Sequence, residues 1–73
     1  MEKKPLVLLV DDEQDLCTLM QMSLSRMGID THIAYRLQEA VQALKTHQYD
    51  ACLTDLNLPD GNGLTLVDFI AQN

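Results

Sequence analysis

The sequence has few cysteines and glycines. Its two cysteines, Cys17 and Cys52, are too few and too far apart for a disulfide framework or a common zinc motif. Only three glycines occur among 73 residues, and none lies in the Asp-Asp-Glu-Gln turn that follows the first apolar segment. A nucleotide-binding fold needs a glycine-rich turn at that place, so the sequence argues against this class.

Basic residues and long apolar segments are also scarce. Five Lys and Arg stand against eleven Asp and Glu, and the net charge of −6 would repel a nucleic-acid backbone. The longest early apolar run, residues 6–10, is too short for a signal peptide or a membrane span. We therefore expect no direct nucleic-acid contact, no membrane insertion and a cytoplasmic location.

Apolar residues make up 47% of the sequence, which is enough for one core. At this length folding removes only roughly 60% of the surface of the unfolded chain, so the stability should be marginal. Three short apolar segments are typical of β-strands, and the first of them has the continuous apolar character of a strand that is buried on both faces. The predicted strands are residues 6–10, 31–35 and 51–53.

Helical spacing of apolar residues follows each predicted strand. The first helix should end at Gly28, and the third should be capped by Asn62. The first helix is expected to turn one apolar stripe toward the core, formed by Leu16, Leu19, Met20, Leu24 and Met27. The second and third helices are marked by Leu37, Ala40, Val41 and Leu44, and by Leu66, Val67 and Ile70.

Alternating strands and helices predict an α/β protein with a doubly wound parallel sheet. Right-handed crossovers place the first two helices on opposite faces and give the strand order 2-1-3. In such sheets a ligand binds beyond the carboxyl ends of the strands, between strands one and three. Asp11, Asp12 and Asp55 follow those two strands, so we expect them to meet at this edge.

Three carboxylates at one edge would repel one another without a cation, and oxygen ligands suit Mg²⁺. An Asp beside Mg²⁺ can act as a nucleophile toward phosphorus. Taken singly, Asp11 or Asp12 could merely cap a helix, and Asp55 could be a turn residue. Their joint position at the ends of two strands favours phosphoryl chemistry with Mg²⁺ as cofactor.

Three segments resemble the receiver domain of bacterial two-component response regulators. They are Val10-Asp11-Asp12-Glu13, residues 53–61 with the sequence LTDLNLPDG, and Gly63-Leu64. The resemblance extends over the whole chain. It is strongest to receivers of the NtrC class, particularly the PilR branch that activates pilus genes. It implies a flavodoxin-like (CheY-like) fold and a signalling role rather than that of an enzyme.

The resemblance also implies the role of each site residue. Asp55 would accept a phosphoryl group from a sensor histidine kinase and would also bind Mg²⁺. Asp12 would bind the metal directly, Asp11 would act through a water, and Asn57 would offer its backbone carbonyl. A receiver-like interaction module that does not use phosphorylation stays open as an alternative.

Receivers of this family continue for about two more strand-helix units, so residues 1–73 are expected to be the N-terminal part of such a domain. The Ser or Thr and the Lys that the family supplies from its later strands have no counterpart here. The third strand would then be an open apolar edge. We expect self-association as a dimer or higher assembly, through this strand or through exchanged elements.

Two other site types fit the sequence poorly. Phosphatases with an aspartyl nucleophile carry a second acid two residues later, where this chain has Asn57. A calcium loop that starts at Asp55 would need a ligand at Pro59 and an acid at Leu66, and neither residue supplies one.

Overall fold

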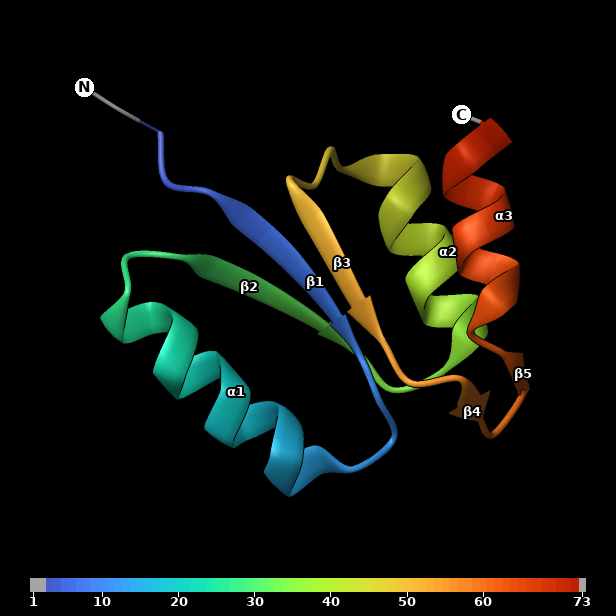
Figure 1. The fold of residues 1–73 in the computed structure, drawn as a ribbon, viewed down its shortest axis with the longest axis horizontal. Coiled ribbons are helices and arrows are strands. Elements are labelled where there is room, and N and C mark those ends of the chain that lie inside the picture. Colours follow the sequence, from blue (N-terminus) through green and yellow to red (C-terminus); the bar gives the residue numbers. More distant parts are fainter. Residues whose placement is uncertain (1–2, 73) are drawn as a thin grey trace.

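The computed structural model describes residues 3–72, which form a parallel sheet flanked by helices (Figure 1). The sheet has the order β2-β1-β3, and both strand pairs are parallel. This confirms the predicted α/β fold and strand order. The elements are β1 (Leu6–Val10), α1 (Gln14–Arg26), β2 (Asp30–Ala34), α2 (Leu37–Thr46), β3 (Ala51–Thr54), β4 (Asn57–Leu58), β5 (Gly61–Asn62) and α3 (Leu64–Gln72).

The central strand β1 is buried because helices cover the sheet on both faces. Leu8 and Val10 point to the face that carries α2 and α3, where they pack with Ala40 and Leu66. Val7 and Leu9 are buried as well, as the continuous apolar run predicted. The core therefore holds β1 in place and fixes the position at which it ends.

The first helix ends where the sequence predicted. Gly28 has a φ of +80°, a conformation that glycine adopts without a steric penalty. Its N–H donates to the carbonyl of Ser25, and the N–H of Ile29 donates to the carbonyl of Leu24, each at 3.0 Å. These bonds satisfy carbonyls at the end of α1, and the reversal leads directly into β2.

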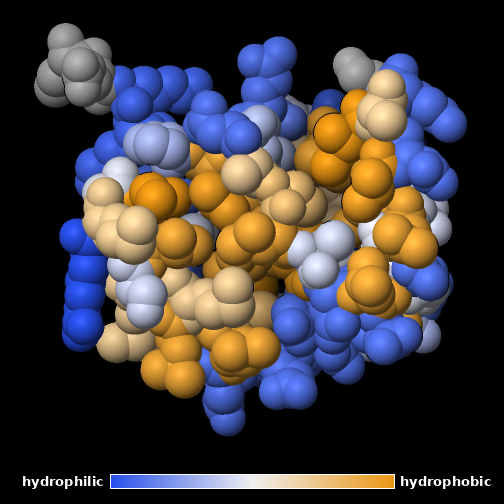
Figure 2. All heavy atoms as spheres, in the orientation of Figure 1, coloured by the Kyte–Doolittle hydropathy of each residue, from blue (hydrophilic) through white to orange (hydrophobic). Residues whose placement is uncertain are grey.

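The apolar stripe that we expected α1 to bury is largely exposed, so that expectation is wrong for most of its members. Leu19 is 62% exposed and Met27 is 70% exposed, whereas the buried residue of the helix is Cys17. Among residues 3–72 the sheet has three strands, so the part of α1 that carries Leu19 has too little sheet to cover it. Figure 2 shows apolar side chains over the middle of the face on view, where Figure 1 draws β1 and β3.

Three further details differ from the sequence prediction. The second strand begins and ends one residue earlier, at Asp30–Ala34. The third strand ends one residue later, at Thr54. The loop after β3 contains a short antiparallel hairpin, in which Asn57 of β4 pairs with Asn62 of β5. Within the described part of the chain, no helix has the length and apolar character needed to cross a membrane.

Candidate functional site

Asp11 and Asp12 lie immediately after β1, at the carboxyl end of the sheet. The backbone N–H of Asp11 donates to the carbonyl of Ala34 at 3.1 Å, which continues the pairing of β1 with β2. The Oδ1 atom of Asp11 accepts a hydrogen bond from the N–H of Glu13 at 3.0 Å. Asp11 is half-buried and Asp12 is exposed, so the pair faces solvent from a fixed turn.

Asp55 follows β3 and is held beside the same edge. Its backbone N–H donates to the carbonyl of Val10 at 2.8 Å, so the end of β3 is tied to the end of β1. Its Oδ1 atom accepts a hydrogen bond from the N–H of Asn57 at 3.2 Å. Among residues 3–72 no group donates a hydrogen bond to the second carboxylate oxygen of Asp55.

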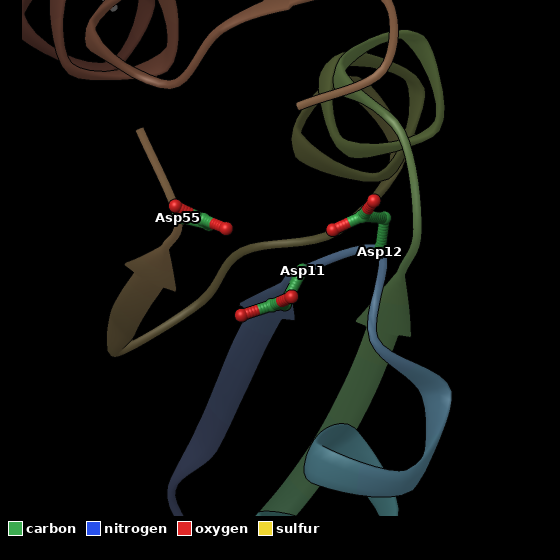
Figure 3. Close-up of side chains that lie close together, drawn as sticks. All are labelled: Asp11, Asp12 and Asp55. Carbon is green, nitrogen blue, oxygen red and sulfur yellow. The ribbon is translucent and has the colours of Figure 1, made fainter. Parts of the chain in front are cut away.

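The three carboxylates come together as predicted. One oxygen atom from each of Asp11, Asp12 and Asp55 lies within 4.8 Å of the other two. In Figure 3 the three side chains point into the same space from the ends of β1 and β3. Such close negative charges repel one another, and a divalent cation coordinated by oxygen offsets this repulsion. The donor set therefore fits Mg²⁺.

Asn57 lies two residues after Asp55 in the first strand of the β4–β5 hairpin. Its side chain is exposed, and its backbone N–H is directed to Asp55. Whether its carbonyl reaches a metal stays a prediction. The hairpin nevertheless keeps the backbone of Asn57 next to the acidic cluster.

Cys17 supports the turn that carries Asp11. Its side chain is 0% exposed, and its thiol donates a hydrogen bond to the carbonyl of Asp11 at 3.4 Å. Burial, reinforced by the charges of Asp11, Asp12 and Glu13, raises the pKa of this thiol. The thiol therefore stays protonated and keeps its role as a donor.

Gly63 and Asp60 are two supporting residues whose roles the sequence did not reveal. A Cβ atom at Gly63 would collide with the carbonyl oxygen of Asp55, so the loop can approach only because this residue is glycine. Asp60 accepts hydrogen bonds from the first two N–H groups of α2, at Leu37 (2.6 Å) and Gln38 (3.0 Å). Those bonds, the one from Gln38 foremost, lower the pKa of Asp60.

The geometry agrees with the comparison with known protein families. The response regulator receiver domain family matches residues 7–73. This chain belongs to that family. Receiver domains are signalling modules of two-component systems, and they generally bind Mg²⁺ at an acidic cluster. In this chain an acidic group of suitable composition is formed by Asp11, Asp12 and Asp55.

The receiver match extends to individual proteins. The chain is 48% identical over 65 residues to response regulator protein PilR of Pseudomonas aeruginosa, which belongs to the NtrC class. It is 34% identical over 67 residues to response regulator ArlR of Staphylococcus saprophyticus. These matches cover 89% and 92% of this chain but only 15% of PilR and 30% of ArlR.

Solved receiver structures have the same fold. The signal receiver domain of a putative Luxo repressor protein from Vibrio parahaemolyticus superposes with a TM-score of 0.91 at 30% identity. A CheY-like receiver domain from Methylobacillus flagellatus gives 0.90 at 31% identity. Each match covers 97% of this chain, and the chain spans 55% and 60% of the two receivers.

Proposed function

We propose that this chain is the phosphoacceptor part of a two-component response regulator, with Asp55 as the residue that becomes phosphorylated. The observation that carries the proposal is the meeting of Asp55 with Asp11 and Asp12, within 4.8 Å, at the carboxyl end of a receiver sheet. Asp55 is the member of the cluster at the end of β3, and its backbone is anchored to β1. A carboxylate held in this way can act as a nucleophile without first having to be positioned.

The resemblance to receiver domains implies which residues of this chain would hold Mg²⁺. Asp12 and Asp55 would bind it directly, the backbone carbonyl of Asn57 would add a third ligand, and Asp11 would act through a water. Bound Mg²⁺ offsets the negative charge of phosphoryl oxygens beside the carboxylates. Mg²⁺ in proteins usually keeps several water ligands and binds one or two protein carboxylates, and this arrangement agrees with that preference.

The reaction is a transfer between two protein side chains. A carboxylate oxygen of Asp55 forms a bond to phosphorus while the P–N bond to a histidine of the sensor kinase breaks, and the imidazole leaves with the bonding electron pair. The product is an acyl phosphate on Asp55. The chain thus acts as a phosphoryl acceptor in a signalling pathway. It does not act as an enzyme that turns over a separate substrate.

The biological setting is proposed from the relatives. The identity to PilR supports a response regulator of the NtrC class, in which the receiver controls a transcriptional output domain. We place the protein in the cytoplasm, with a sensor histidine kinase as partner and without direct nucleic-acid contact from residues 1–73. The match to 55–60% of the solved receivers supports the view that these residues correspond to the N-terminal part of such a domain.

Intact-mass spectrometry tests the proposal. A complete receiver domain that contains residues 1–73 is incubated with Mg²⁺ and a small acyl phosphate, and one phosphoryl group should be gained. Asp55→Asn should abolish the gain because the nucleophilic oxygen is replaced by an amide. The matched control is Asp68→Asn, which removes an exposed acid on α3 and should leave labelling unchanged.

Equal labelling of the Asp55→Asn variant would place the acceptor at another residue. No labelling of the complete domain, with its fold confirmed by circular dichroism, would favour a receiver-like interaction module that works without phosphorylation. We also propose that the chain associates with itself through β3.

A further inference from the structure

Two histidines and a tyrosine form a cluster away from the acidic edge. His47 and Tyr49 lie in the connection from α2 to β3, at the amino ends of the strands (Figure 1). His32 lies on β2 and pairs with Leu8, which packs on the side of α2, so the side chain of His32 projects from the same face of the sheet. The phosphoacceptor site makes no use of these two histidines or of Tyr49.

The three rings lie close together. The ring centroids of His32 and His47 are 4.9 Å apart, and the ring planes are nearly perpendicular at 80°. The Nδ1 atom of His32 and the hydroxyl group of Tyr49 share a hydrogen bond of 2.7 Å. Both histidines are exposed, so their contact buries little apolar surface. Burial in a core therefore does not explain why the two imidazoles lie together.

The spacing of the two imidazoles fits a shared metal ion. In a tetrahedral zinc site each histidine nitrogen lies about 2.0–2.1 Å from the metal, which places the centroids of two bound rings about 5 Å apart. Imidazole nitrogen suits Zn²⁺, Cu²⁺ and Ni²⁺, whereas Mg²⁺ prefers oxygen ligands. The histidine pair therefore differs in metal preference from the cluster of Asp11, Asp12 and Asp55.

Tyr49 is placed to orient one of the two imidazoles. A histidine that binds a metal through one nitrogen usually donates a hydrogen bond from the other, and this bond fixes the ring and its tautomer. When the N–H of Nδ1 is directed to the oxygen of Tyr49, the free lone pair of His32 is on Nε2. Burial, with a smaller contribution from Cys52, raises the pKa of Tyr49, so the phenol stays neutral beside the imidazole.

An ion can reach the cluster from solvent. Two open cavities, of about 550 Å³ and 660 Å³, adjoin it. His47 lines both cavities, Tyr49 lines the first and His32 lines the second. Two basic and two acidic side chains also line them, namely Lys3, Lys4, Asp30 and Asp50. The formal charges of these four side chains cancel, so they present no net positive charge that would repel a cation.

We propose that His32 and His47 form a second metal site, which binds a transition-metal ion such as Zn²⁺ through one nitrogen of each imidazole. Tyr49 is a positioning residue that keeps Nε2 of His32 turned toward the ion. No third His, Cys, Asp or Glu joins the pair among residues 3–72, so water molecules complete the coordination. The bound ion ties β2 to the connection that leads into β3. The site is independent of Mg²⁺ and of phosphorylation at Asp55.

Calorimetric titration with Zn²⁺ tests the site in a complete receiver domain that contains residues 1–73. Excess Mg²⁺ is present throughout and competes for the acidic cluster. His32→Gln and His47→Phe should each weaken Zn²⁺ binding by more than about tenfold, because each removes a ligand and the second keeps an aromatic ring in place. Tyr49→Phe should weaken binding by about tenfold. The matched control is Tyr35→Phe, just after the other end of β2, which should leave the affinity unchanged.

Nitrogen NMR of the imidazole rings tests the geometry without depending on the folding of any variant. In the unchanged domain, Zn²⁺ should shift the signal of Nε2 of His32 and the signal of one nitrogen of His47. The signal of Nδ1 of His32 should remain that of a protonated nitrogen, because this atom donates to Tyr49. A shift of Nδ1 in place of Nε2 would overturn the role assigned to Tyr49.

Two results would overturn the site itself. The first is equal Zn²⁺ affinity in the unchanged domain and in a folded variant that carries both His32→Gln and His47→Phe. The second is a Zn²⁺ titration that leaves the imidazole nitrogens of both histidines unshifted. Because labelling of Asp55 is measured by mass in a separate experiment, failure of the histidine site leaves the phosphoacceptor proposal standing.

Discussion

Replacement of Gly63 by alanine tests how the loop after Asp55 supports the site. The backbone N–H of Gly63 donates to the carbonyl of Leu56 at 3.0 Å, which folds the β4–β5 hairpin back against Asp55. An added Cβ would collide with the carbonyl oxygen of Asp55 and would lie 2.9 Å from the Oγ1 atom of Thr54. The backbone that carries the phosphoacceptor would therefore have to move.

The expected cost can be worked out from this crowding. Overpacking of a site typically costs about 1–3 kcal/mol, and alanine offsets about 0.4–1 kcal/mol by restricting the unfolded chain. A net loss of about 1–2 kcal/mol would lower the melting temperature by about 4–16 °C in a domain of this size. Displacement of Asp55 should also weaken Mg²⁺ binding by about tenfold or more, as expected when support of a metal ligand is lost.

Gly28→Ala is the matched control for this experiment. It places alanine at a φ of +80°, with no atom within 4 Å of the added Cβ, so it should cost about 1–2 kcal/mol through backbone strain alone. Urea unfolding should show both variants to be destabilised, whereas calorimetric titration should show weaker Mg²⁺ binding in Gly63→Ala only. Equal Mg²⁺ affinity in the two variants would refute the argument that Gly63 positions Asp55.

Two further substitutions probe the fold around the site. Asp60→Asn should lower the melting temperature at neutral pH because the first N–H groups of α2 lose a charged acceptor. The pKa of Asp60 is lowered from its ordinary value of 3.8, so its contribution is complete above that pH and is lost as the pH falls through the lowered pKa. Thermal unfolding of both proteins should therefore give a difference that shrinks below about pH 4, and a constant difference would contradict the role of the charge. Leu8→Ala, at a 0% exposed core position, should cost about 2–5 kcal/mol in urea unfolding, whereas Leu64→Ala, at a 54% exposed position, should change stability by less than about 0.5 kcal/mol.

The strand order and the position of the acids were predictable from the sequence because both follow from local patterns and general rules. A continuous apolar run identified β1 as the central strand, and the right-handed crossover connections then determined the order of its neighbours. The carboxyl ends of neighbouring parallel strands meet at one edge, so the sequence positions of Asp11 and Asp55 were enough to bring them together. Asn62 was recognised as the cap of α3, and its Oδ1 accepts a hydrogen bond from the N–H of Leu64 at 2.8 Å.

The features that the sequence did not reveal depend on contacts between distant segments. Asp60 caps α2 from a position 22 residues beyond Gln38, and no spacing rule connects the two. The need for glycine at position 63 arises only when the loop is packed against Asp55. The pattern of α1 was read correctly as helical, but periodicity cannot show how much sheet is available to cover Leu19.

The metal site at the carboxyl ends of β1 and β3 is tested most directly by locating a bound divalent cation. Mn²⁺, which substitutes for Mg²⁺ at oxygen sites, broadens the NMR signals of nearby amides. Titration of the isotope-labelled chain should broaden the amides of Asp11, Asp12 and Asp55 first, and Mg²⁺ should reverse the effect by competition. Broadening that begins instead at Asp30 and Asp50, at the opposite end of the strands, would contradict the account.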